Sequence, residues 1–192
     1  MANPCKDAVV SKAYRMARLA QKNILPKETI DEVIYRTERM RDRLMIELQA
    51  RSGLRIGEVV RLNGADVEGR KLTLWNPKSG NESEIAYLTT SLAERLHAYI
   101  QENHRPPNES IFGVTYSGAR YIVRSAGEKV GIRVRPHDLR RHSATYASRN
   151  GVPLEVISKV ILRHQDLKTT QVYLGKVSER EALQWMDNLH GR

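Results

Sequence analysis

A single short stretch with β-strand character interrupts a chain whose apolar residues otherwise recur with a helical period. The segments KLTLW (71–75) and SEIAYL (83–88) contain β-branched and aromatic residues, and the turn-forming sequence NPKSGNE separates them. Two such strands suffice for a small hairpin and for little more. We therefore expect a mainly α-helical α+β fold that carries a small β-hairpin or a three-stranded sheet.

The rest of the chain predicts helices. Between Pro26 and Gly53, apolar residues fall near a 3.6-residue period, which indicates one or two amphipathic helices, and Gly53 is expected to stop the helix. Another helix is expected to begin in LRIGEVVRL (54–62), and Ser91 with Glu94 has the spacing of a capping box for SLAERLHAYI (91–100). Further helices are expected near 117–130, 138–149, 153–162, 167–174 and 179–189.

The charge of the chain indicates a polyanionic partner. The formal net charge is +10, and the stretch from Ala119 to Lys176 holds twelve Lys and Arg against four Asp and Glu. Residues 1–25 add five basic side chains against one Asp, and we interpret them as a basic linker or arm. A merely solvated basic face is the alternative interpretation of such a charge excess.

The sequence also excludes several classes of protein. Cys5 is the only cysteine, so neither an internal disulfide nor a cysteine-based structural zinc site is expected. No apolar run approaches the roughly 18 residues that span a membrane, and the N-terminus lacks the pattern of a secretory signal. We expect a cytoplasmic, nucleoid-associated protein without a membrane partner.

The motif RPHDLRRHSAT (135–145) gathers nitrogen-rich side chains at a predicted helix start. Arg140 and Arg141 follow His137 by three and four residues, so each can share a helix face with it. Helix N-termini attract phosphate, and a guanidinium group can grip two of its oxygens. This cluster suits a phosphate better than a metal, although a solvated helix start would have the same composition.

Five other candidate residues are weak signals when each is taken alone. Arg55 follows Gly53 at a loop-to-helix junction, with Glu58 three residues later to orient Arg55 or a nearby histidine. Lys78 lies at the tip of the predicted hairpin, where a lysine is usually only solvated. Tyr173 follows His164 by nine residues in a predicted helix, where a tyrosine is ordinarily part of the core or of an interface.

Together these motifs resemble those of the tyrosine recombinase family of phage integrases and Xer-type recombinases. SGLRIGE resembles the first arginine box, PHDLRRHSAT the second box and LRHQDLKTTQVYL the third. The resemblance runs from about residue 26 to residue 173 and implies the catalytic-domain fold of that family. It carries the catalytic roles onto six positions, which are Arg55, Lys78, His137, Arg140, His164 and Tyr173.

The resemblance implies an enzyme that cuts and rejoins double-stranded DNA through a 3′-phosphotyrosyl intermediate. Tyr173 is then the nucleophile, Arg55 and Arg140 stabilise the transition state, and Lys78 protonates the leaving 5′-oxygen. His137 accepts or orients the proton of the tyrosine, and His164 hydrogen-bonds the phosphate. No cofactor, metal or ATP is implied, so activity is expected in a chelator.

The chain departs from the family pattern at two places. Arg163 stands where the third box usually has glycine, and we expect it either to strain the turn before His164 or to supply a further phosphate contact. The candidates for supporting or DNA-contacting residues are Glu58, Arg141 and Arg163. Only about 25 residues precede Pro26, where the family usually has a helical DNA-clamping domain, so an excised catalytic domain is expected, with a naturally short protein as the alternative.

These considerations divide the chain into an arm (1–25), a catalytic domain (26–177) and a C-terminal helix (178–192). The last helix carries an apolar stripe that could pack on a neighbouring protomer in a dimer or tetramer on DNA, or on its own domain. Three other functions are alternatives: a type IB topoisomerase-like activity, a catalytically silent DNA-binding module, and a metal-dependent nuclease. The nuclease is disfavoured because the basic stretch has no ligand-like cluster of carboxylates.

Overall fold

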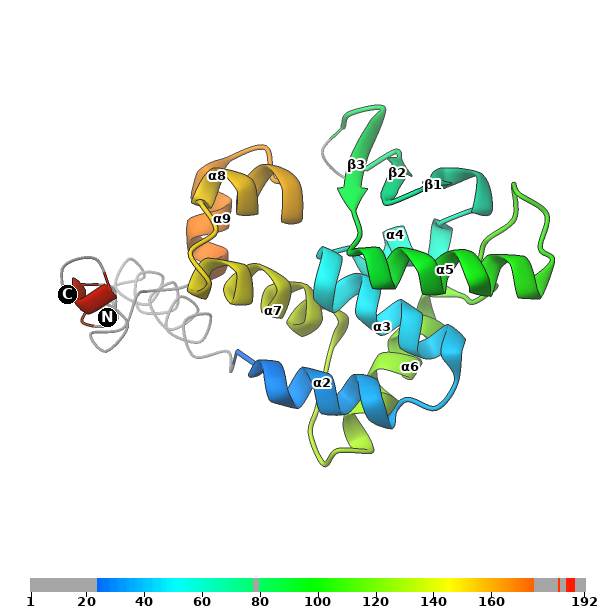
Figure 1. Cartoon of the computed structure of the whole chain (residues 1–192), viewed down its shortest axis with the longest axis horizontal. Helices are drawn as coiled ribbons and strands as arrows, with labels where there is room; N and C mark the ends of the chain where they lie inside the picture. The colour runs from blue at the N-terminus through cyan, green and yellow to red at the C-terminus, as the bar shows by residue number, and fades with distance from the viewer. Residues whose placement is uncertain (1–23, 78–79, 175–182, 184–185, 189–192) are drawn as a thin grey trace, which may run out of the picture.

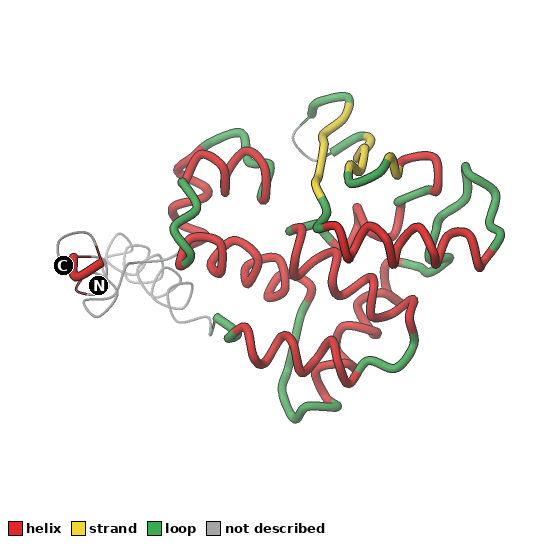
Figure 2. Tube along the Cα trace, viewed as in Figure 1, coloured by secondary structure: helices red, strands yellow, loops and turns green. Residues whose placement is uncertain are grey.

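Helices make up most of the computed structural model, which describes residues 24–77, 80–174, 183 and 186–188 (Figures 1 and 2). The longer helices are α2 (Lys27–Arg36), α3 (Met40–Ser52), α5 (Thr90–Asn103), α6 (Tyr116–Glu128), α7 (Pro136–Arg149) and α9 (Leu167–Leu174). The shorter ones are α4 (Ile56–Arg61), the 3₁₀ turn η1 (Gly64–Asp66), α8 (Leu154–Val156) and the π-helical turn η2 (Ile157–Ile161). The strands are β1 (Val67–Glu68), β2 (Lys71–Trp75) and β3 (Ser83–Tyr87).

Helix α3 is the centre of the helical core. It packs against α2, α5, α6 and α7, and its side chains Leu44, Met45, Ile46 and Leu48 are all fully buried. The helix ends at Gly53, whose φ of 65° lies in the left-handed region that glycine adopts without strain. The predicted segment 26–53 is therefore two helices, and the predicted stop at Gly53 is confirmed.

A three-stranded antiparallel sheet replaces the simple hairpin. Strand β2 pairs with β1 on one side and with β3 on the other, and Leu74 lies opposite Glu84. Leu72, Leu74 and Ala86 are buried on the inner face, as the two-residue period requires. In Figure 1 the sheet lies above α4 and α5, while the segment from α8 to α9 lies above α7. Strand β3 contacts η2, which brings these two parts together.

Helix α7 joins the main core to a smaller apolar cluster at its C-terminal half. Leu139 belongs to the main core, whereas Ala144 and Ala147 pack with Ile157 and Leu162 of the segment that follows. Helix α9 also packs on α7. The predicted helix over 153–162 is in fact the short α8 continued by a π-helical turn, and such turns are often found at functional sites.

The predicted capping box of Ser91 and Glu94 is wrong. Helix α5 begins at Thr90, and the hydroxyl of Thr89 accepts a hydrogen bond from the Leu92 amide at 3.3 Å. The reason lies in the strand before it, because Leu88 still donates its amide to the Arg70 carbonyl and the chain turns directly afterwards. Thr89 is therefore the first residue free to cap the helix.

Candidate active site

Arg55 and Glu58 form a pair at the junction between α3 and α4. Arg55 precedes the first residue of α4, and the Glu58 carboxylate reaches back to it. The Arg55 amide donates to Oε2 at 2.7 Å and its Nη1 donates to Oε1 at 2.6 Å. The Arg55 side chain keeps 25% of its surface exposed, against 4% for Glu58. The acid thus anchors an arginine whose outer edge faces solvent.

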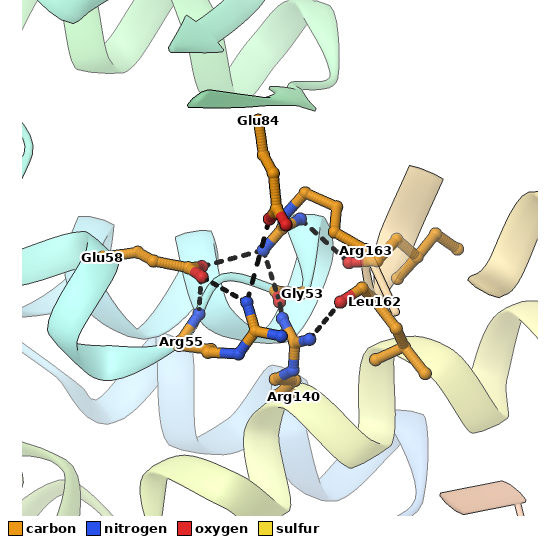
Figure 3. A network of polar contacts seen from close by, with 8 residues as sticks. Gly53, Arg55, Glu58, Glu84, Arg140, Leu162 and Arg163 are labelled. Atoms are coloured by element: carbon orange, nitrogen blue, oxygen red, sulfur yellow. Dashed lines mark hydrogen bonds and ion pairs between the residues drawn. The ribbon is translucent and has the colours of Figure 1, made fainter. Parts of the chain in front are cut away.

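Arg140 enters the same region from α7. Its side chain is buried, and its guanidinium group donates to the carbonyl oxygens of Gly53 and Leu162 (Figure 3). These two carbonyls belong to segments that are about 110 residues apart in the sequence, so Arg140 ties the α3–α4 junction to the end of η2. The burial of Arg140 argues against a merely solvated basic helix start.

His164 lies in the turn between η2 and α9. Its Nδ1 is 3.0 Å from the hydroxyl of Thr170, which in turn donates to the Ser158 hydroxyl at 3.0 Å. Burial, followed by the positive charges of Arg140, Arg55 and Arg163 and by His137, lowers the pKa of His164 to about 4. The imidazole is therefore neutral at pH 7.

The two histidines of the PHDLRRH motif have different surroundings. His137 is exposed at the start of α7 and is close enough to His164 to lower its pKa. His142 is buried on another face of the helix, where its Nδ1 lies 2.9 Å from the Leu25 carbonyl and its ring stacks on Tyr146. Burial lowers the pKa of His142, so this neutral ring is part of the packing. Arg141 is likewise buried on α7.

Arg163 occupies a left-handed turn, with φ at 49°. Its side chain is only 3% exposed and is directed into the protein, where Nη2 donates to Glu58 Oε2 at 2.8 Å. Nη1 donates to the Ile161 carbonyl at 2.9 Å, and Nε lies 3.3 Å from Glu84 Oε2 as an ion pair. Of the two expected consequences of an arginine here, the strained turn is therefore present, while the guanidinium group points away from solvent.

Glu84 is a member of this network that the sequence analysis did not identify. It lies on β3 with only 8% of its side chain exposed, near Arg163 and 3.9 Å from Nη1 of Arg55. The two-residue period of a strand could have predicted that Glu84 faces inward, because it shares a face with the buried Ala86 and Leu88. An acid on the inner face of a strand calls for a cationic partner.

Burial by itself would raise the pKa of Glu58, but Arg163 and Arg55 together lower it below its usual value. The carboxylate is therefore ionised. The network joins the guanidinium groups of Arg55, Arg140 and Arg163 with the carboxylates of Glu58 and Glu84 (Figure 3). This leaves one positive charge in excess among these five residues, which favours an anion in front of Arg55.

Two of the six candidate catalytic residues are not placed at the level of their side chains. Tyr173 lies in α9, a helix that packs on α7, while its side chain is outside the described part of the chain. Lys78 falls between β2 and β3 and is outside the described residues. The predicted arm (1–25) and C-terminal helix (178–192) also lie almost wholly outside them.

A groove beside the candidate site is strongly basic. Four arginines of α6 and of the segment before α7 line it, namely Arg120, Arg124, Arg133 and Arg135. All four are exposed, and the groove extends to Pro136, the residue before His137. In the described part of the chain, no group of three or more His, Cys, Asp or Glu side chains is placed to hold a metal ion.

The profile of the phage integrase family matches residues 22–180 of this sequence. The chain belongs to the phage integrase family. Tyrosine recombinase XerA of Saccharolobus solfataricus is 32% identical over 146 residues, which are 75% of this chain and 49% of that protein. The chain spans about half the length of the curated relatives it matches, with shares of 49%, 57% and 50% for three of them.

Solved structures of recombinases have the same fold. A crystal structure of XerA recombinase superposes with a TM-score of 0.75 at 23% identity, over 88% of this chain and 66% of that one. XerH recombinase bound to its palindromic difH substrate gives a TM-score of 0.64 at 19% identity, over 86% of this chain and 52% of that one. The expected family and its catalytic-domain fold are thus confirmed. None of the helices in the described ranges is long and apolar enough to cross a membrane.

Proposed function

We propose that this chain is the catalytic part of a site-specific DNA recombinase, which cuts and rejoins duplex DNA through a 3′-phosphotyrosyl intermediate. The observation that carries the proposal is the convergence of Arg55, Arg140 and the turn that contains His164 from three distant segments, with His137 three residues before Arg140 on α7. Membership of the phage integrase family and the DNA complex of the structural neighbour XerH support it.

The two arginines suit the stabilisation of a phosphodiester transition state. Arg55 is held from behind by Glu58 while its outer edge faces solvent, and Arg140 is fixed by two backbone carbonyls. Donors that are oriented before the reaction lose little free energy in reorganising when charge develops, and each contributes roughly 3–4 kcal/mol. The non-bridging oxygens of the scissile phosphate bind to these guanidinium groups.

The chemistry requires one nucleophile and two proton transfers. The Tyr173 oxygen loses its proton to His137, or by way of it, and forms a bond to phosphorus. The bond between phosphorus and the 5′-oxygen breaks, and Lys78 supplies the proton for that oxygen. Attack by a free 5′-hydroxyl on the phosphotyrosine reverses these steps, so that bond energy is conserved and no ATP is consumed.

His164 contributes a neutral hydrogen-bonding group to the phosphate. Its Nδ1 is engaged by Thr170, whose hydroxyl is fixed by Ser158, so the orientation of the ring is set from inside the protein. A neutral ring adds no further positive charge beside Arg55, Arg140 and Arg163. The buried chain of hydroxyls thus orients the imidazole much as a triad residue orients its base.

The proposal also assigns roles in DNA binding and in assembly to the other parts of the chain. The basic arm 1–25 and the groove lined by arginines bind the DNA backbone, and residues 26–177 form the catalytic domain. The helix over 178–192 packs on another protomer when a dimer or tetramer assembles on DNA; the 60% and 56% exposure of Leu183 and Met186 supports this. The protein is accordingly cytoplasmic and nucleoid-associated.

The test is the formation of a covalent DNA adduct in EDTA. Supercoiled plasmid is incubated with the chain, with Tyr173→Phe, and with the matched control Tyr35→Phe, which changes a tyrosine that is 75% exposed on α2. We expect relaxed plasmid and detergent-resistant protein–DNA complexes for the chain and for the control, and neither for Tyr173→Phe.

The remaining outcomes distinguish the other functions. An adduct that survives in Tyr173→Phe assigns the nucleophile to another residue. Binding of DNA without any adduct favours the catalytically silent module. Relaxation without strand exchange between two duplexes favours the topoisomerase-like activity.

A further inference from the structure

Arg163 adopts a backbone conformation that an arginine enters only at a cost. Its φ of 49° lies in the left-handed region, and glycine would occupy the same turn without strain. A π-helical turn ends at Ile161, two residues before it, and His164 follows directly after it. The side chain must therefore supply something that outweighs the strain of its own backbone.

What it supplies is a buried positive charge between two acids. The Glu58 carboxylate is 4% exposed and the Glu84 carboxylate 8%, and both lie within ion-pair distance of the Arg163 guanidinium group. Each of these acids is also near Arg55, at 2.6 Å for Glu58 and 3.9 Å for Glu84. Arg55 and Arg163 thus share two carboxylates, and the charges of this four-residue set balance.

Without Arg163, the balance would be one cation against two anions. Glu84 would then keep its contact with Arg55 and would compete with the phosphate of the substrate for this guanidinium group. Glu58 would also lose the contact at Oε2 that complements its bond to Arg55 at Oε1. Both effects would draw Arg55 inward and place excess negative charge beside the DNA.

We propose that Arg163 is a positioning residue that neutralises Glu58 and Glu84, so that Arg55 stays directed at the scissile phosphate. Because Glu84 belongs to β3, the same ion pair ties the His164 turn to the strand that follows the loop containing Lys78. The inference deepens the proposed function and rests on it for the role of Arg55. A glycine at this place could not replace the charge.

The test is a charge-rescue experiment with the single change Arg163→Gly and the double change Arg163→Gly with Glu84→Gln. Affinity for a fluorescein-labelled 20-base-pair duplex is measured by anisotropy, and adduct formation is measured on supercoiled plasmid. We expect Arg163→Gly to lose about tenfold or more in both, and removal of the Glu84 charge to restore most of the loss. A residue needed only for packing would show no rescue by a second change that deletes another buried partner.

His104→Gly is the matched control for backbone strain. His104 has a φ of 47° and is exposed at the end of α5, so its replacement by glycine relieves similar strain without touching the network. We expect it to leave DNA affinity unchanged. If Arg163→Gly also leaves affinity unchanged or raises it, Arg163 is only a strained substitute for glycine and the proposal is wrong.

Two further results distinguish a failure of this proposal from a failure of the proposed function and from misfolding. Rescue of DNA affinity in a chain that never forms an adduct supports the charge balance and refutes catalysis. If Arg163→Gly does not fold, Arg163→Lys takes its place, since it keeps the charge and loses the fork. An affinity for Arg163→Lys at least tenfold below that of the unchanged chain would overturn the charge argument.

Discussion

Replacing Gly53 by alanine is expected to damage both folding and the candidate site. A Cβ at this position would lie 2.7 Å from the Ile161 carbonyl oxygen and 2.9 Å from Ile161 Cγ2, distances at which the neighbour must move. The left-handed conformation costs an alanine about 1–2 kcal/mol. Overpacking against Ile161 adds about 1–3 kcal/mol. The free energy of unfolding should therefore fall by about 2–5 kcal/mol.

Gly69→Ala separates the two contributions. Gly69 has a φ of 54°, close to the 65° of Gly53, but a Cβ there would meet nothing within 4 Å. We expect this control to lose only the conformational part, about 1–2 kcal/mol. Urea denaturation of both variants measures the difference, which should be about 1–3 kcal/mol.

The functional loss in Gly53→Ala should exceed the loss of folded protein. Movement of Ile161 displaces the turn with Leu162 and His164, and Arg140 donates to the carbonyls of both Gly53 and Leu162. Adduct formation, normalised to the folded fraction, is expected to fall in Gly53→Ala and to stay unchanged in Gly69→Ala. Equal destabilisation by the two variants, within about 0.5 kcal/mol, would refute the close approach of Gly53 to Ile161.

Three further predictions concern pH, helix capping and salt. The pKa of His164 is about 4 in the folded chain, against the ordinary 6.5, so its neutral form stabilises the fold fully above about pH 6.5 and this contribution is lost as pH falls toward 4. Between pH 7 and pH 5, urea denaturation should show a larger loss of unfolding free energy for the unchanged chain than for His164→Gln. Equal losses would contradict the burial of this ring. Thr89→Ala should lower the unfolding free energy by about 1 kcal/mol and Ser91→Ala by under about 0.5 kcal/mol. A larger loss for Ser91→Ala than for Thr89→Ala would show that Ser91 caps the helix. Replacing both Arg120 and Arg124 by alanine should weaken duplex binding and reduce the slope of log K against log salt by roughly 2, whereas an unchanged slope would place the DNA backbone elsewhere.

Local sequence signals predicted most of the helices and strands to within a few residues. The β-rich stretch, the helical periods and the stop at Gly53 each depend on a few neighbouring residues, so they can be predicted without knowledge of the fold. The wrong prediction of the helix cap arose where two nearby residues could cap the same helix and a tertiary contact decided between them. Thr89 rather than Ser91 caps α5 because the pairing of Leu88 with the sheet ends directly before it.

The sequence by itself determined the family, the order of the boxes and the residue types available for phosphate chemistry, because each box is a contiguous set of residues. Only the tertiary structure decided which of these side chains meet. In the folded chain, His137 and His142 lie on different faces of α7. The side chain of Arg163 points inward and pairs with Glu84, which lies on a strand 79 residues before Arg163 in the sequence. Periodicity tells which face of an element is buried, but not which segment covers that face. Charge pairing across 50 or 100 residues depends on that packing, and so does the orientation of Arg55 toward its proposed substrate.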